Sequence, residues 1–113
     1  MKEVSKNELN NAAMQIILHA GDCRNLLNEA IQMTERDAEL CKIDEKIKEA
    51  KCEITKAHKI QTEMIQSTIE NDELETTLLF THAQDTLMTI YSELNMTNTI
   101  LRLYRKLADR IQE

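Results

Sequence analysis

The chain has no proline and no tryptophan, and its 113 residues include a single glycine, Gly21. Tight hairpin turns and sheet corners depend on glycine, proline or Asn-Gly pairs, so this scarcity argues against a β-sheet fold. Aromatic residues make up only 3% of the sequence, so a core has to be built from leucine, isoleucine, methionine and alanine. With abundant Glu, Lys, Leu, Ala and Met, these absences predict an all-α fold of long helices.

Other absences exclude classes of function. No apolar run approaches the roughly 20 residues of a membrane-spanning helix, and residues 1–5 carry no apolar signal-peptide core. We therefore expect a cytoplasmic protein without direct membrane insertion. The net charge of −6 is spread over interspersed acids and bases, which disfavours nucleic-acid binding because phosphate neutralisation needs a basic surface. The length fits one domain, residues 1–113.

The chain has three cysteines, Cys23, Cys41 and Cys52, which form no CxxC pair. Each falls within a helical stretch, so we expect three buried, reduced thiols. No Cys-His cluster has the spacing of a zinc site, and HExxH, GxSxG and Gly-rich phosphate-loop motifs are absent. Local motifs for hydrolysis or nucleotide binding are thus lacking.

Apolar residues recur every three or four positions through three stretches, the spacing of one helix face. These positions are Ala13, Ile16, Ala20, Cys23, Leu27 and Ala30; then Leu40, Ile43, Ile47, Ala50, Ile54, Ala57 and Met64; and then Phe80, Ala83, Leu87, Ile90, Leu94, Leu101, Tyr104, Ala108 and Ile111. The polar residues Gln61 and Thr97 fill the two remaining positions on these stripes. Short connections between three such helices predict an antiparallel, up-down-up three-helix bundle. A bundle this slender buries little surface, so we expect several subunits to associate.

Helix boundaries are marked by capping residues. Ser5 followed by Glu8 is a capping box at the start of the first helix. Thr34 and Asp37 are both candidate N-caps for the second helix. The third helix is expected to begin at residues 74–77.

The three histidines, His19, His58 and His82, all lie on predicted helices. An isolated helical histidine is usually exposed or satisfied in the core, so His19 and His58 receive no chemical role, and Gln61 is expected to bond a buried polar partner near one of them. His82 differs because Asp85 follows one turn later, beside the apolar stripe, where a polar pair is costly unless satisfied. An acid there can take a proton from one ring nitrogen and leave the other as a nucleophile.

Three segments give a more specific indication: residues 16–24 (IILHAGDCR), residues 57–65 (AHKIQTEMI) and residues 78–85 (LLFTHAQD). In order and spacing they resemble the first-helix, second-helix and active-site segments of the lactose/cellobiose-type enzyme IIA of the bacterial phosphoenolpyruvate-dependent sugar phosphotransferase system. The resemblance covers nearly the whole chain.

This resemblance implies three-helix subunits in a homotrimer that acts as a phosphocarrier. The histidine phosphocarrier protein is the implied donor, and a cysteine of enzyme IIB is the implied acceptor during import of a β-glucoside or disaccharide. His82 matches the phosphorylated histidine. Asp85 matches the aspartate that meets its two symmetry mates around a metal ion, usually Mg²⁺. Three bare carboxylates would repel one another, and a divalent cation with oxygen ligands removes that repulsion.

Four residues complete the expectations. Thr86 stands where such segments usually carry a second histidine. Any contact that the second imidazole makes in the family is therefore changed here, but the phosphoryl acceptor, His82, is not. Gln84 points elsewhere on the helix and receives no catalytic role, Arg24 is expected to be a solvated surface residue, and Gly21 is expected to be a packing glycine or a tolerated defect.

The alternative function is a helical interaction or regulatory module that has lost phosphotransfer.

Overall fold

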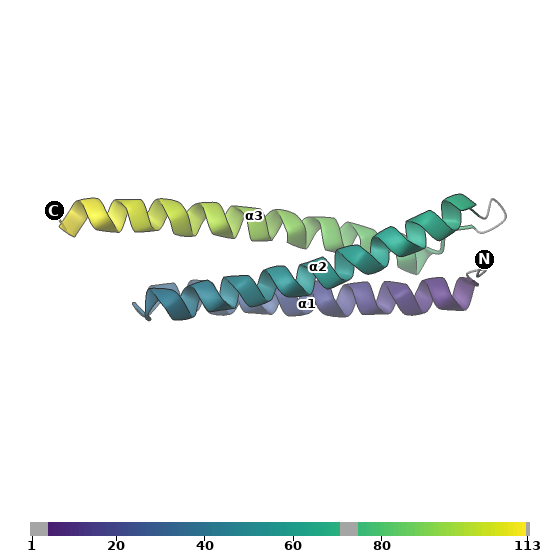
Figure 1. Cartoon of the computed structure of the whole chain (residues 1–113), viewed down its shortest axis with the longest axis horizontal. Coiled ribbons are helices and arrows are strands. Elements are labelled where there is room, and N and C mark those ends of the chain that lie inside the picture. Colours follow the sequence, from purple (N-terminus) through teal and green to yellow (C-terminus); the bar gives the residue numbers. More distant parts are fainter. Residues whose placement is uncertain (1–4, 71–74, 113) are drawn as a thin grey trace.

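The structure is a computed structural model, which describes residues 5–70 and 75–112. It contains three helices: α1 (Lys6–Glu35), α2 (Leu40–Glu70) and α3 (Leu78–Gln112). They run up, down and up along a molecule 63 Å long (Figure 1). The all-α prediction is confirmed, and the third helix begins one residue after the predicted range, part of which lies outside the described residues.

The predicted cap of α1 is present. The Ser5 hydroxyl accepts a hydrogen bond from the backbone N–H of Glu8 at 3.1 Å. This bond satisfies one of the N–H groups that the first turn of a helix leaves without a partner. The helix then continues without interruption to Glu35.

The connection from α1 to α2 differs from the prediction. The Ala38 N–H donates to the Met33 carbonyl at 2.9 Å and the Asp37 N–H donates to the Thr34 carbonyl at 3.1 Å, which together form a Schellman motif. Asp37 occupies its left-handed position, with φ of 58°. The prediction that Thr34 or Asp37 caps α2 is therefore wrong: both belong to the end of α1, and the Glu39 carbonyl accepts the first backbone bonds of α2.

The core follows the predicted apolar stripes up to Leu101. Helix α1 contacts both other helices, whereas α2 and α3 touch each other least. Leu40, Tyr104 and Ile111 are exposed, so the prediction that they belong to the core is wrong. The C-terminal end of α3 projects beyond the α1–α2 connection (Figure 1), so neither of the other two described helices covers it there.

The expectation for two of the three cysteines is also corrected. Cys23 is buried, but Cys41 and Cys52 are exposed, because they lie off the apolar stripe of α2. Apart from its chain neighbours and the backbone of its own helix, a side-chain Cβ at Gly21 would meet no described atom within 4 Å, so no close packing explains this glycine within one subunit and the alternative of a tolerated defect stands. No helix in the described part of the chain is long and apolar enough to cross a membrane.

Candidate functional site

His82 lies at the start of the second turn of α3. Thr77 caps this helix, because its hydroxyl accepts the Phe80 N–H at 3.1 Å and its carbonyl accepts the Thr81 N–H. Helical side chains lean toward the N-terminus, where unpaired N–H groups and the helix dipole favour negative charge. An anionic group carried by His82 would therefore meet a favourable field.

His82 and Asp85 are both exposed, and no hydrogen bond joins them within the described residues. In the single subunit, both side chains therefore keep their contact with water, and the pair incurs no cost of desolvation. Three residues correspond to about 300° of helix rotation, so the two side chains lie about 60° apart around α3. Each can face a different neighbour while remaining one turn apart.

Thr86 supports the backbone at this site. Its hydroxyl donates to the His82 carbonyl at 2.9 Å, the back-bonding that threonine commonly makes within helices. Thr86 therefore contributes no side-chain donor toward the imidazole in this arrangement. Gln84 is partly buried, and its side chain makes no hydrogen bond among the described residues.

The other polar predictions have mixed outcomes. His58 is exposed and Gln61 is buried, but the Gln61 side chain makes no hydrogen bond to another residue of 5–70 or 75–112, so the expected buried polar partner is not found among them. Arg24 is exposed as expected, yet it is not merely solvated. Its guanidinium forms a bidentate pair with Glu93 at 2.8 and 2.6 Å, which ties α1 to α3.

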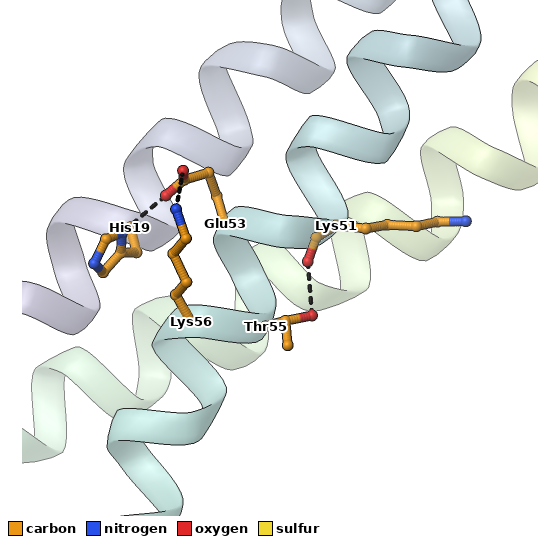
Figure 2. A network of polar contacts seen from close by, with 5 residues as sticks. All are labelled: His19, Lys51, Glu53, Thr55 and Lys56. Carbon is orange, nitrogen blue, oxygen red and sulfur yellow. Dashed lines mark hydrogen bonds and ion pairs between the residues drawn. The ribbon is translucent and has the colours of Figure 1, made fainter.

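A second polar group lies between α1 and α2 (Figure 2). His19 Nδ1 is 2.8 Å from Glu53 Oε2, and Lys56 Nζ donates to Glu53 Oε1 at 3.0 Å. Two hydrogen bonds lower the pKa of the Glu53 carboxyl: the one from His19 has the larger effect and the one from Lys56 the smaller. Glu53 therefore remains an ionised carboxylate held toward α1.

Asp22 completes a His/Asp/Glu group that sequence reasoning missed. One donor atom from each of His19, Asp22 and Glu53 lies within 4.8 Å of the others. The sequence could have indicated this group through the pairing of positions between α1 and α2. His19 and Asp22 are one turn apart, and a helical hairpin that turns at residues 36–37 places position 19 opposite position 53. In the described part of a single subunit, Asp85 belongs to no comparable group.

Comparisons with known proteins agree with this architecture. A family model described as "PTS system, Lactose/Cellobiose specific IIA subunit" matches residues 11–105. The lichenan-specific phosphotransferase enzyme IIA component of Bacillus subtilis (strain 168) is 38% identical over 104 residues, covering 91% of this chain and 93% of the relative. The PTS system lactose-specific EIIA component of Lacticaseibacillus casei is 26% identical over 105 residues, covering 93% of each.

Solved structures give the same result. The cellobiose-specific enzyme IIA from Bacillus anthracis matches with a TM-score of 0.80 at 32% identity, covering 93% of this chain and 94% of that chain. PtcA from S. mutans matches with a TM-score of 0.82 at 32% identity, covering 89% and 98%.

The chain belongs to the lactose/cellobiose-specific IIA family of the phosphotransferase system. It is therefore an enzyme IIA component, a phosphotransferase that carries a phosphoryl group in sugar transport. The resemblance seen in residues 16–24, 57–65 and 78–85 is confirmed at the level of the family. All three segments lie within the matched range.

Proposed function

We propose that this enzyme IIA component carries its phosphoryl group on His82. The single observation behind this choice is position: His82 is an exposed imidazole in the family-like segment, one turn inside the capped N-terminus of α3. His19 is engaged with Glu53, and His58 lies in the interior of α2, far from a helix end. His82 thus combines access with a favourable field for negative charge.

The transfer needs only an accessible ring nitrogen. Its lone pair attacks the phosphorus carried by the histidine phosphocarrier protein, and the bond from phosphorus to the donor's nitrogen breaks. In the second transfer, the cysteine thiolate of enzyme IIB attacks the same phosphorus and the bond to His82 breaks. Thr77 and Thr86 hold the backbone on either side of the imidazole during both steps.

A stripe of exposed apolar residues on α3 supports assembly as a homotrimer. We call it the outer stripe; each member is more than half exposed, and its members are Met96, Ile100, Leu103, Leu107 and Ile111. Its spacing of four, three, four and four residues is that of one helix face. A large exposed apolar patch of this kind marks a protein interface. Since the stripe faces away from the core, pairing it with other copies of α3 buries it.

Asp85 lies on the N-terminal continuation of the outer stripe, through Thr89 and Ser92 at the same spacing. In a trimer built on this face, three Asp85 carboxylates would converge while His82 stays about 60° to the side. Hard carboxylate oxygens fit Mg²⁺, and Asp85 is exposed, with no hydrogen-bond partner among the described residues. The ion would neutralise the clustered charge and link the subunits.

Mutation of the outer stripe tests the trimer. Leu103→Glu places a charge within the proposed interface, so the protein should sediment as a monomer rather than a trimer. Leu18→Glu is the matched control, because Leu18 is a similarly exposed leucine on α1. A Leu103→Glu protein that remains trimeric would show that the subunits associate through another surface.

The phosphoryl acceptor is tested by reconstitution. The chain is incubated with phosphoenolpyruvate, enzyme I and the histidine phosphocarrier protein, and then analysed by mass spectrometry under alkaline conditions, where a phosphoramidate survives. One phosphoryl group per subunit is expected for the parent, His19→Ala and His58→Ala proteins, and none for His82→Ala. Equal labelling of His82→Ala would reject the assignment, and a trimer that is never labelled would favour the helical interaction module.

The transported sugar is proposed only as a class. Similar proteins include lichenan-specific, lactose-specific and N,N'-diacetylchitobiose-specific components. We therefore propose that this component works in the cytoplasm with a system that imports a disaccharide or β-glucoside. Transport assays across β-glucosides with the intact system would identify the sugar.

A further inference from the structure

We propose that His19, Asp22 and Glu53 bind a divalent transition-metal ion, Zn²⁺ in preference to Mg²⁺, which cross-links α1 to α2. The three donors come from the middle of two packed helices, and two of them, His19 and Glu53, are only 27% and 21% exposed. This site is separate from His82 and Asp85, and it does not depend on the phosphotransfer assignment.

The distances are close to those of a zinc site. Zinc binds imidazole nitrogen and carboxylate oxygen at about 2.0–2.2 Å, so two ligands on a tetrahedron lie about 3.4 Å apart. The three donor atoms here already lie within 4.8 Å of one another, and His19 Nδ1 is 2.8 Å from Glu53 Oε2. The remaining adjustment falls on Asp22, whose exposed side chain is free to rotate. Water supplies the fourth ligand, as in open zinc sites.

The donor types select the metal. Imidazole suits Zn²⁺ and its neighbours in the transition series, whereas Mg²⁺ prefers oxygen ligands in an octahedral arrangement. Two carboxylates and a neutral imidazole also match the double positive charge of the ion. The proposed Asp85 site offers oxygen alone, so the two sites are distinguishable by their metal preference.

Lys56 opposes metal binding in a way that can be tested. Its ammonium occupies Glu53 Oε1, while Oε2 faces His19 (Figure 2). A bound cation would be repelled by this ammonium, but the Lys56 side chain is 57% exposed and can move away. Exposed pairs of this type contribute little to stability. Lys56→Gln should therefore tighten zinc binding.

The test is calorimetric titration of the full chain with ZnCl₂ in excess Mg²⁺. Cys41→Ser and Cys52→Ser are introduced first, because both thiols are exposed and would bind zinc themselves. One zinc per subunit is expected. His19→Ala should weaken binding by at least about 10-fold, the order of effect seen when the surroundings of a metal ligand are disturbed. His58→Ala, which changes an exposed histidine on α2, should leave the affinity unchanged.

Further measurements cover the alternative outcomes. Asp22→Asn should also weaken binding, and circular dichroism identifies a variant that has lost helix; in that case His19→Gln replaces His19→Ala. Substitution by Co²⁺ should give ligand-field absorption without thiolate charge-transfer bands. Absence of zinc binding, unchanged affinity in the folded His19 variant, or a thiolate spectrum would each overturn the proposal.

Discussion

His82 and His58 are both exposed histidines on helices, and their positions along those helices distinguish them. His58 lies in the interior of α2, where the N–H groups are bonded within the helix. His82 lies at the start of the second turn after the Thr77 cap, so the proposed phosphoryl group there would benefit from the helix dipole by at most about 0.3–1 kcal/mol, since this effect falls off beyond the first turn. A negatively charged group is therefore better stabilised on the histidine at position 82 than on the one at position 58.

At the same scale, the three cysteines should differ in reactivity. Burial, with Glu93 and then Glu53 adding negative charge, raises the pKa of the Cys23 thiol to about 11. The reactive thiolate is therefore scarce at pH 8, and we predict that iodoacetamide modifies Cys41 and Cys52 but spares Cys23 in the native protein. Peptide mass spectrometry with and without urea measures this, and native labelling of Cys23 at the rate of Cys41 would contradict it.

At the scale of the elements, the α1–α2 connection carries backbone strain at Asp37. A non-glycine residue at φ of 58° is less favourable than glycine, although aspartate tolerates this region better than most. Since the left-handed conformation costs roughly 1–2 kcal/mol for an ordinary L-residue and less for aspartate, we predict that Asp37→Gly raises the free energy of unfolding by up to about 1 kcal/mol, measured by urea denaturation. Asp37→Ala is the control and should destabilise. A lower urea midpoint for Asp37→Gly would contradict a strain at this position.

The tie between α1 and α3 predicts a pH dependence. Hydrogen bonding to Arg24 lowers the pKa of Glu93 below its ordinary value of 4.5. A lowered folded-state pKa stabilises the protein above the unfolded value, and this contribution is lost as the pH falls through the folded value. Glu93→Gln should therefore reduce the fall in thermal midpoint on acidification, whereas Glu63→Gln, a change at an exposed glutamate without a side-chain bond among the described residues, should not. The same fall in thermal midpoint on acidification for the parent and Glu93→Gln proteins would refute this.

At the scale of the whole molecule, the periodic pattern was sufficient to predict three helices and most of the core, because helix periodicity is local. It failed at Tyr104 and Ile111, because their burial depends on where α1 ends relative to α3. It also missed the contact of His19 with Glu53, since that contact arises from the register of the hairpin. The family-like segments placed His82 and Asp85 on one turn, but a single subunit leaves both exposed, so their proposed roles depend on other chains.

Asp85 provides the test of that dependence on other chains. If three copies converge, Asp85→Leu removes mutual repulsion and puts an apolar side chain on the same face of α3 as the outer stripe, so the trimer should be as stable as the parent or more so. Mg²⁺ binding should be lost, and chelation by EDTA should weaken the parent trimer while leaving the variant unaffected. Sedimentation equilibrium with and without Mg²⁺ measures both effects. Asp109→Leu, at an exposed aspartate off the outer stripe of α3, is the matched control and should behave as the parent. Collapse of Asp85→Leu to monomers would show that the carboxylate is not at a subunit axis.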